Sequence, residues 1–335
     1  MFDIITIGGA TRDITFITDK GKVIKTPENL TEQSLLAFEY GSKIRSEEVF
    51  FNFGGGSCNT AATFAKLGLN VAVNCRIGKD DDGESMKKNL KGMGIVTDLI
   101  QIDKQRKTGS SLVVVDKKDG DRVIFIYKGA SDFLEVKEEE INQTKWIYLT
   151  SIAGNWQEDL EEINKAISNN NIKLAWNPGA TQICAGKKEL ESVFKNTEIL
   201  VINKDEAIEL VGSDEKIKLN YNETTDPKIL LNIIKKWGPK VIVITDGSEG
   251  AYAYDGKNVL YSLATSKIKI DSTGAGDAFG SALVAGYILN NNIETALKYG
   301  IINSGNVVSE YGAQNGILSK DEIKKRLEDV KVSYL

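Results

Sequence analysis

The amino-acid sequence predicts an α/β protein: a doubly wound, mostly parallel sheet flanked by helices, with a small separate β-sheet as a lid. Short apolar, β-rich runs alternate with amphipathic helical patterns over most of the chain, which is typical of a parallel sheet covered on both faces. Two stretches, about 12–52 and 108–132, interrupt this alternation with strands and turns alone. We therefore expect one domain over residues 1–335, with these two insertions forming the lid.

The main elements follow from these patterns in chain order. The predicted strands are 4–7, 71–74, 146–149, 174–176, 199–202 and 241–245, with a further β-rich segment at 267–270. The predicted helices are 59–67, 84–93, 157–168, 205–211, 227–237, 278–289 and 293–309. Several boundaries carry their own signals: glycines follow three helix ends, Asp226-Pro227 is an N-cap before a first-turn proline, and residues 319–322 match a capping box. The three glycines are Gly68, Gly94 and Gly238.

The two insertions allow a second interpretation. The run SSLVVVDKKDGDRVIFIYKG is typical of a hairpin, and a small sheet built from such hairpins could cover a pocket. The alternative is that these strands extend the edges of the main sheet. We favour the lid.

Composition excludes several classes of function. Lys and Arg total 42 against 47 Asp and Glu, a net charge of −5 without a basic block, so we expect no nucleic-acid partner. No apolar run reaches the length of a membrane span, and the start MFDIITIGG is typical of a strand, not a signal peptide. Three scattered cysteines fit a reducing cytoplasm. With no histidine in the chain, acid–base chemistry falls to Asp, Glu, Lys or Tyr.

The most informative segment is DSTGAGDAF at 271–279, a glycine turn that leads into an apolar helix. The first N–H groups of a helix are unpaired and lie at the positive end of its dipole, so this turn is a candidate anion site. Gly274 and Gly276 let the backbone approach the anion closely. Asp277 would repel an anion, which suggests a base that deprotonates a hydroxyl attacking a phosphoryl group. The alternative is an ordinary helix N-terminus with an aspartate cap.

A second glycine turn, Gly54-Gly55-Gly56, leads into the helix predicted to contain Asn59, and Asp13 follows the first strand. Ligands of open α/β sheets bind beyond the carboxyl ends of the strands, where these side chains could receive ligand hydroxyls. The segment matches neither a dinucleotide fingerprint nor a Walker A loop. A plain strand–helix turn and a turn-stabilising aspartate are the alternatives.

Two further strand ends carry polar or glycine-rich segments. Asn203 and Glu206 could hold a hydrated Mg²⁺ against phosphates, or form only a helix cap. Thr245, Gly247 and Gly250 follow the next strand and could bring the backbone against a nucleotide. A hairpin turn into AYAY is the competing account.

Together these motifs resemble the ribokinase-like, or PfkB, carbohydrate kinase family. DSTGAGDAF resembles the C-terminal signature of that family, with Ser272 where threonine is usual, and GGGSCNTAATFAKLG at 54–68 resembles the N-terminal one. The remaining family motifs occur in order, and the resemblance covers essentially the whole chain. They are Asp13, Asn177-Pro178, N-x-x-E at 203–206, the glycine loop at 245–250 and Gly312-Ala313.

The resemblance implies an ATP- and Mg²⁺-dependent kinase that phosphorylates an alcohol of a small sugar. Asp277 would be the general base, and the amides of Gly274, Ala275 and Gly276 would hold the transferring phosphoryl group. Residues expected to bind substrate hydroxyls are Asp13, Gly54, Gly55 and Asn59. Residues expected to line the nucleotide site are Asn203, Thr245, Gly247, Gly250 and Gly276.

It also implies metal sites and an assembly. Glu206 and Asp271 are the metal candidates, and a monovalent cation such as K⁺ could lie near Asp271, Thr273 and Gly312. The lid would mediate a homodimer. One departure concerns the nucleotide: many relatives have asparagine where this chain has Ile301, with Asn303 nearby, which leaves the adenine contacts and the preference for ATP open.

Two alternative functions remain open at this point. One is a nucleoside kinase of the same family, in which Phe125 and Tyr127 of the lid hairpin stack on a base. The other, more remote, is a non-catalytic ligand-binding regulator that uses the kinase fold.

Overall fold

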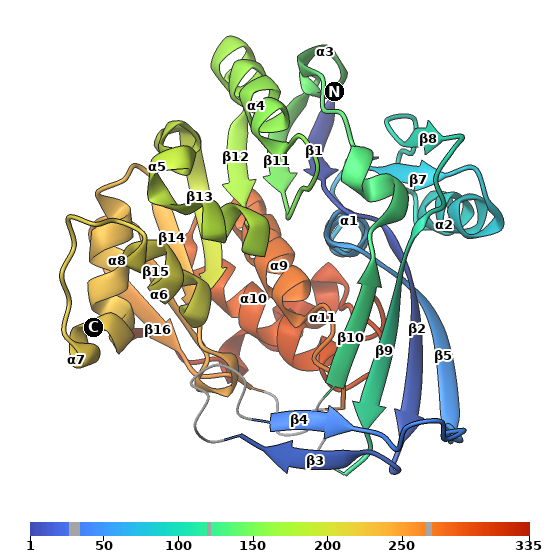
Figure 1. Cartoon of the computed structure of the whole chain (residues 1–335). Helices are drawn as coiled ribbons and strands as arrows, with labels where there is room; N and C mark the ends of the chain where they lie inside the picture. Colours follow the sequence, from blue (N-terminus) through green and yellow to red (C-terminus); the bar gives the residue numbers. More distant parts are fainter. Residues whose placement is uncertain (27–33, 119–121, 266–269) are drawn as a thin grey trace.

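The computed structural model of the chain describes residues 1–26, 34–118, 122–265 and 270–335. Its centre is a nine-stranded sheet in the order β17-β16-β15-β14-β13-β12-β11-β1-β6 (Figure 1). Strands β6 (Val71–Asn74), β1 (Phe2–Ile7), β11 (Thr144–Leu149), β12 (Lys173–Trp176), β13 (Thr197–Asn203) and β14 (Val241–Thr245) are parallel. Antiparallel strands β15 (Ala251–Tyr254), β16 (Val259–Ser262) and β17 (Ser333–Tyr334) complete one edge. The six predicted parallel strands are confirmed.

Helices cover both faces of this sheet, so the core consists of two apolar layers. One layer includes buried side chains of α1 (Gly56–Lys66), α2 (Asp81–Gly92), α9 (Ala275–Asn290), α10 (Ile293–Val307) and α11 (Lys320–Lys325). The other includes side chains of α3 (Glu138–Ile141), α4 (Trp156–Asn170), α5 (Ala180–Asn196), α6 (Lys204–Gly212) and α8 (Pro227–Lys235). Short α7 (Tyr221–Thr225) has no buried residue. The doubly wound architecture is therefore confirmed.

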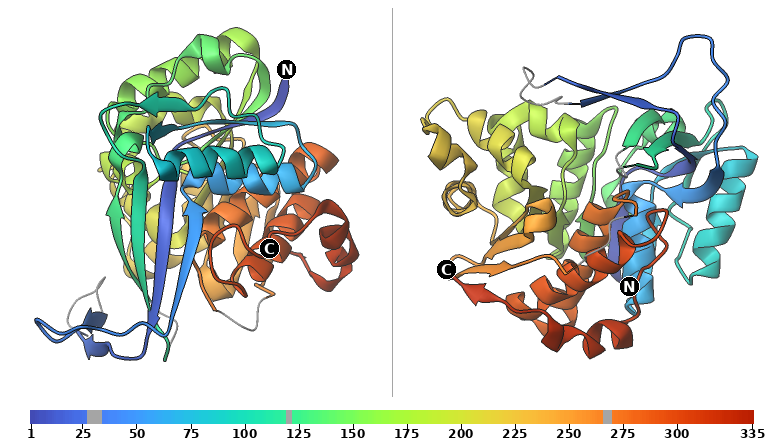
Figure 2. Two further views of the ribbon diagram at one scale, coloured as in Figure 1. Left: turned by 90° about the vertical axis from the view of Figure 1, so that its right-hand side faces the viewer. Right: turned by 90° about the horizontal axis from the view of Figure 1, so that it is seen from below.

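The two insertions form a separate sheet beside the helical layers (Figure 2). Its four strands run in the order β10 (Arg122–Tyr127), β9 (Gly109–Asp116), β2 (Thr11–Thr18) and β5 (Glu48–Gly54). A two-stranded ribbon joins β3 (Lys22–Lys25) and β4 (Ser34–Ala37), and a short pair joins β7 (Arg76–Gly78) and β8 (Gln101–Asp103). Because none of these strands pairs with the main sheet, the lid prediction is confirmed and the edge-strand alternative is wrong.

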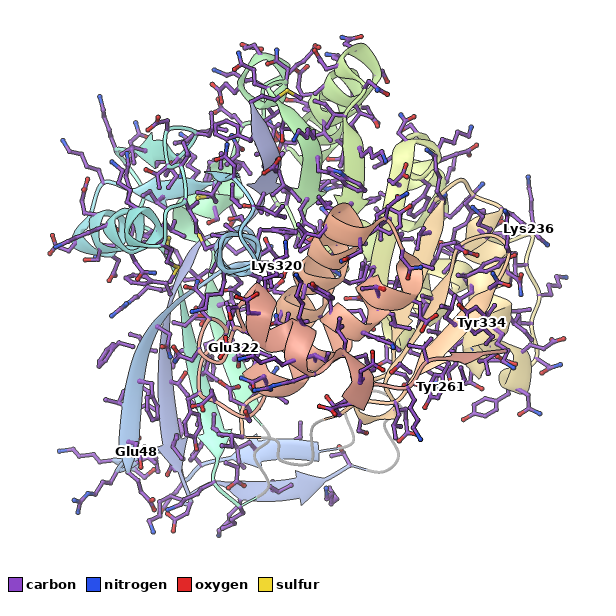
Figure 3. All side chains as sticks on the ribbon, turned by 180° about the vertical axis from the view of Figure 1, so that it is seen from behind. Glu48, Lys236, Tyr261, Lys320, Glu322 and Tyr334 are labelled. Carbon is purple, nitrogen blue, oxygen red and sulfur yellow. The ribbon has the colours of Figure 1, made fainter. Side chains whose placement is uncertain are left out.

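Local sequence signals account for most helix ends. Gly68, Gly94 and Gly238 have φ angles of +88°, +78° and +135°, which favour glycine after a helix. Asp226 accepts a hydrogen bond from the Lys228 amide, with Pro227 opening the helix. Glu322, labelled in Figure 3, closes the capping box with Ser319.

Two predictions about elements need comment. Helix α5 was missed because Gly186, with φ of +80°, interrupts its pattern at a kink between two helical stretches. The predicted strand 267–270 overlaps residues 266–269, which lie outside the described residues, as do residues 119–121 between β9 and β10. No helix within the described ranges combines the length and apolar character needed to cross a bilayer.

Candidate active site

The glycine turn at 271–276 leads directly into α9, as the sequence indicated. Gly274 is in the left-handed conformation with φ of 73°, and a Cβ there would lie 2.3 Å from the Cβ of Ala313. A Cβ at Gly276 would meet no atom within 4 Å. Glycine is thus required at 274 by both backbone geometry and packing, while the surface of the turn at Gly276 is open to a ligand.

The amides of this turn are only partly engaged. The Ala275 N–H donates to the Ser272 carbonyl at 3.2 Å, and the Ala278 N–H donates to the Gly274 carbonyl at 2.8 Å. The N–H groups of Gly276 and Asp277, which lie between them in sequence, donate to no acceptor among the described residues. These are the orphan donors of a helix N-terminus and are available to an anion. The Ala275 amide, expected among the anion-binding donors, is engaged by the Ser272 carbonyl instead.

Asp277 lies in a short chain of hydrogen bonds that crosses from α9 to α1. Asn59 Nδ2 donates to Asp277 Oδ2 at 2.8 Å, and Gln314 Nε2 donates to Asn59 Oδ1 at 3.1 Å. Burial raises the pKa of Asp277, and the charge of Asp13 raises it further, while the Asn59 hydrogen bond opposes both. The carboxyl group is therefore tuned toward accepting a proton.

Asp13 faces the same region from β2. Thr11 Oγ1 and Ser111 Oγ donate to its Oδ1 at 2.8 and 2.7 Å, and burial raises its pKa. Its Oδ2 lies so close to Gly54 that a Cβ there would be only 1.9 Å away. Gly55, with φ of +90°, is equally restricted, because its Cβ would lie 2.4 Å from the Gly9 carbonyl oxygen. Gly54 thus makes room for the Asp13 carboxylate, and Gly55 makes room for the backbone that follows β1.

A cavity of about 590 Å³ adjoins the anion turn. Thr245, Gly247, Gly250 and Gly276 line it, together with Ala275. Four residues predicted for the nucleotide site therefore meet in one cavity. The hairpin account of the 245–250 loop is confirmed, since β14 and β15 pair antiparallel, while its contact with a nucleotide stays a prediction. Sequence reasoning missed its other lining residues, which are Ser248, Ala264, Ser272, Phe279, Ser304, Gly305 and Val308.

The departure at position 301 falls within this cavity. Ile301 is among the lining residues, where the asparagine expected from the family resemblance would add polar groups. Asn303 does not replace it: it is fully buried, its Nδ2 donates to the Ala278 carbonyl, and its Oδ1 accepts from the Leu318 amide. The wall of the cavity is consequently apolar at this point.

Asn203 and Glu206 form a capping box at the start of α6. Asn203 Oδ1 accepts from the Glu206 amide, and Glu206 Oε2 accepts from the Asn203 amide, both at 2.8 Å. Neither residue lines the cavity, although Asn203 lies opposite Thr245 in the sheet. Burial raises the pKa of Glu206. Among the described residues no group of three or more His, Cys, Asp or Glu side chains converges as a metal cluster.

Asp271 anchors the base of the anion turn. Its Oδ1 accepts from the Thr273 amide at 2.8 Å and its Oδ2 accepts from the Gly312 amide at 3.0 Å. The Thr273 hydroxyl oxygen beside it is buried and has no partner among the described residues. Asp271, Thr273 and Gly312, expected near a monovalent cation, are thus brought together.

The structure adds a residue that sequence reasoning missed, Arg122 of the lid. Its Nη1 donates to the Ser272 hydroxyl in the anion turn, and its Nε is buried without a partner in the described residues. Arg122 lies on the same lid face as Asp13. It pairs with Val115 on β9, and Val115 shares its face of that strand with Ser111, which pairs with Asp13. The sequence shows that the predicted lid hairpin contains this arginine. It does not show that the arginine contacts a segment 150 residues away.

Phe125 and Tyr127 lie on the opposite lid face. Phe125 pairs with Leu112, which pairs with Ile14, whereas Asp13 shares its row with Ser111. Because neighbouring residues in a strand alternate between faces, Phe125 and Tyr127 face away from Asp13. Phe125 is 61% exposed on this outer face.

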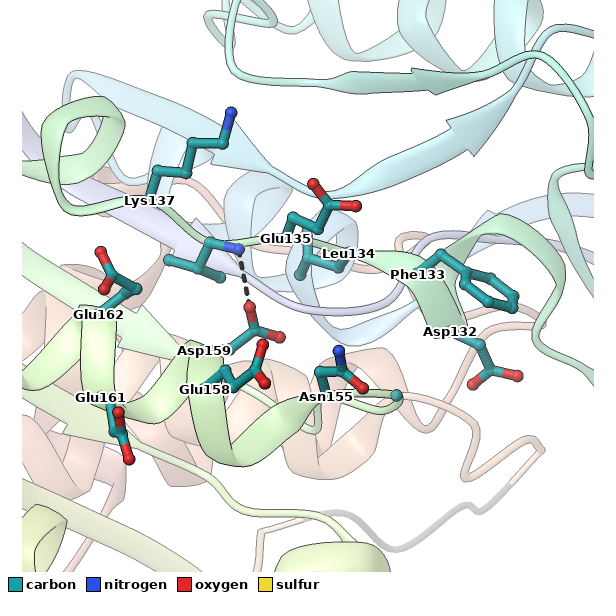
Figure 4. Close-up of a pocket in the computed structure, with 12 residues that line it drawn as sticks. Asp132, Phe133, Leu134, Glu135, Lys137, Asn155, Glu158, Asp159, Glu161 and Glu162 are labelled. Atoms are coloured by element: carbon teal, nitrogen blue, oxygen red, sulfur yellow. Dashed lines mark hydrogen bonds between the residues drawn. The ribbon is translucent and has the colours of Figure 1, made fainter.

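A second cavity, of about 650 Å³, lies between the segment that follows the lid and the start of α4 (Figure 4). Its polar lining is mostly acidic: Asp132, Glu135, Glu158, Asp159, Glu161 and Glu162, with Lys137 as the one cation of the lining. Asp159 is 4% exposed, and its Oδ1 accepts from the Val136 amide at 2.8 Å. Burial raises its pKa to about 6. None of the predicted site residues lines this cavity.

Three features of the α/β fold and its site are together typical of a phosphotransferase: free amides at a helix N-terminus, a proton acceptor beside them, and a separate lid sheet. The profile of the pfkB family carbohydrate kinases matches residues 23–320. The chain therefore belongs to this family and is a ribokinase-like sugar kinase.

Individual relatives agree with this assignment. The chain is 26% identical to a 5-dehydro-2-deoxygluconokinase of Halalkalibacterium halodurans over 306 residues, covering 88% of this chain and 91% of that one. It is 28% identical to a ribokinase of Lactococcus lactis over 304 residues, with the same coverage of 88% and 91%.

Solved structures share the fold. The Arabidopsis thaliana ribokinase complexed with ribose and ATP superposes with a TM-score of 0.78 at 19% identity, covering 98% of this chain and 99% of that one. The Methanocaldococcus jannaschii nucleoside kinase gives 0.76 at 21% identity, covering 98% of both chains. At these identities the likeness concerns the fold alone.

Proposed function

We propose that the protein transfers the γ-phosphoryl group of ATP to a hydroxyl of a small sugar. One observation carries this proposal: Asp277, held by Asn59, adjoins the free amides of the anion turn, and Asp13 faces the same region. A sugar bound by Asp13 and Asn59 would place one hydroxyl against Asp277, while the phosphates would enter from the 590 Å³ cavity.

In the transfer step Asp277 accepts the proton of the substrate hydroxyl as its oxygen forms a bond to the γ-phosphorus. The bond from that phosphorus to the bridging oxygen breaks, and ADP leaves with the electron pair. The free amides of Gly276 and Asp277 would bind the equatorial oxygens as charge redistributes. Arg122, already in contact with Ser272, supplies the positive charge from the lid side.

The residues present fit two kinds of ion. Mg²⁺ keeps several waters and is held mainly by phosphates plus one or two carboxylates, so the single Glu206 with Asn203 is an adequate partner. Asp271 would be the second carboxylate. A K⁺ ion would find the unpartnered Thr273 hydroxyl next to Asp271. When bound, the Mg²⁺ would neutralise charge on the phosphates.

The geometry favours a sugar over a nucleoside. Phe125 and Tyr127, the aromatic side chains expected to stack on a base, face away from Asp13. The relatives named 5-dehydro-2-deoxygluconokinase and ribokinase suggest a sugar or a sugar acid of five or six carbons.

We also propose a homodimer formed through the outer face of the lid. Phe51, Ile14, Leu112 and Phe125 form one row across four strands, and Phe51 and Phe125 are 58% and 61% exposed. Apolar rows of this kind mark interaction surfaces. A cytoplasmic location stays a prediction from the sequence, with the three cysteines free in the structure.

The test is turnover across a panel of pentoses, hexoses, sugar acids and nucleosides with ATP and Mg²⁺, repeated with Asp277→Asn. A sugar or sugar acid should be phosphorylated, and Asp277→Asn should lose about 10³-fold in kcat while ATP affinity is retained. Near-normal turnover by the variant would refute the base assignment. A nucleoside as the best substrate would favour the alternative, and ligand affinity without any ATP consumption would favour the regulator.

A further inference from the structure

Tyr148, on the central strand β11, carries a hydroxyl that the fold leaves unpaired. The side chain is fully buried, and its OH makes no hydrogen bond within the described part of the chain. Thr6, its register partner on β1, also has a buried hydroxyl without a partner there. Burying an unpaired hydroxyl destabilises a protein, so two of them on neighbouring strands need a reason.

The ring of Tyr148 is fixed between two helices. The ring of Phe64, on α1, packs edge-on against it with centroids 5.3 Å apart. On the other side a Cβ at Gly280, on α9, would lie 2.2 Å from the Tyr148 hydroxyl oxygen. The hydroxyl group is therefore held against the backbone of α9, with little room to move.

These two helices carry the residues of the candidate base. Asn59 belongs to α1 and Asp277 to α9, and Gly280 comes three residues after Asp277, on the same face of the helix. The negative charge of Asp277, after burial, contributes to raising the pKa of Tyr148, so the two groups interact electrostatically. The Tyr148 hydroxyl thus lies against α9 about one turn after Asp277.

Three groups from three different elements act on Asp277. Asp13, on β2, disfavours its ionised form, while the Asn59 amide, on α1, favours it. Tyr148, on β11, is the third: its O–H makes no hydrogen bond within the described residues, so its interaction with Asp277 is electrostatic. An O–H dipole directed at a carboxylate stabilises the ionised form.

Resting on the phosphotransfer proposed above, we propose that Tyr148 is a positioning residue. Its hydroxyl, locked at the seam between α1 and α9, holds Asp277 in the ionised form that accepts the substrate proton. Because the two groups form no hydrogen bond in the structure, it acts through the dipole of its O–H group or through one bridging water.

The first test does not need turnover. Tyr148→Phe removes one oxygen and keeps the packing, so the variant should fold. In wild type and variant, the ¹³C signal of the Asp277 carboxyl group, assigned with Asp277→Asn, is followed through a pH titration. We expect its midpoint to rise by about 0.5 to 1 pH unit in Tyr148→Phe. Tyr299, another fully buried tyrosine but on α10, provides the matched control Tyr299→Phe, which should titrate as wild type.

A second readout is kinetic. With the sugar found in the panel, the acid limb of the kcat/KM profile should shift to higher pH by the same amount in Tyr148→Phe. At pH values below the midpoint kcat/KM should fall three- to tenfold, while the plateau at higher pH should stay about the same. An unchanged Asp277 titration in Tyr148→Phe, or an equal shift in Tyr299→Phe, would overturn the inference. If wild type phosphorylates nothing in the panel, the proposed function fails, while the NMR titration still decides the role of Tyr148.

Discussion

Asn59 Nδ2 lies 2.8 Å from Asp277 Oδ2, although 218 positions separate the two residues in the chain. This contact joins the two signatures of the family, one at the start of α1 and one at the start of α9. It gives the carboxylate a donor that favours ionisation, against the burial and the Asp13 charge that oppose it.

Asn59→Ala should raise the pKa of Asp277, because the amide that stabilises the carboxylate is removed. Hydrogen bonds to charged groups contribute about 1.5–3 kcal/mol, so kcat/KM should fall by about 10- to 100-fold at low pH and recover in part as the pH rises. The measurement is the pH profile of kcat/KM. Gln314→Ala, which removes only the outer link to Asn59, should have a smaller effect. A uniform loss at every pH would show that Asn59 acts on binding alone.

Arg122→Gln should weaken phosphoryl transfer, since it removes the positive charge that the lid places at the anion turn. We expect kcat to fall by about 10- to 100-fold with little change in sugar affinity. Arg45→Gln is the matched control, because Arg45 is an exposed arginine of the lid insertion, three residues before β5 begins. Steady-state kinetics with ATP and sugar varied separately distinguish the two. Equal losses in both variants would contradict the assignment.

Asp159→Asn should stabilise the protein in a pH-dependent way. The pKa of Asp159 is raised from 3.8 to about 6 by burial, so the folded state binds the proton more tightly than the unfolded state. The free energy of unfolding of the wild type therefore falls by at most about 3 kcal/mol as the pH rises from about 4 to about 6. Above that pH the contribution of Asp159 is constant.

Denaturant unfolding from pH 4 to pH 8 measures this effect. The difference between Asp159→Asn and wild type should grow through that window and level off above it. Glu158→Gln, at a neighbouring carboxylate of the same cavity, should give a smaller change of the same sign. A difference that does not depend on pH would show that burial of Asp159 is not the cause.

Leu112→Glu should convert the proposed dimer to a monomer, because Leu112 lies within the apolar row of the outer lid face and a charge there would be desolvated on association. Light scattering coupled to size exclusion should report half the wild-type mass. Tyr221→Glu on α7, 83% exposed, is the control and should keep the mass of wild type. A wild type that is already monomeric would remove the lid from consideration as a dimer interface.

Much of the fold was predictable because each element carries a local signal. Strands β1, β6 and β11 through β14 are apolar runs, and glycine or proline marks the helix boundaries. Helix α5 was missed because the kink at Gly186 splits it into two stretches too short to show a helical period. Local pattern therefore reveals regular elements and hides irregular ones.

The site was predictable only where its chemistry is contiguous in sequence. The turn at 271–277 and the glycines at 54–55 could be recognised from residue type and order. Arg122 and Gln314 could not be placed, since each meets the site through tertiary packing. Ile301 could be associated with the nucleotide only through the family resemblance. Asn203 and Glu206 show the opposite difficulty: their spacing fits both a capping box, which they form, and an ion site.

In the hydrogen-bond chain that joins Gln314, Asn59 and Asp277, Asn59 is separated by 255 positions from Gln314 and by 218 from Asp277. No short excised fragment can contain all three side chains, and each pair meets only after distant parts of the chain have docked. Catalytic output should consequently behave as an all-or-none reporter of complete folding. During refolding, activity should return no earlier than the slowest tertiary signal.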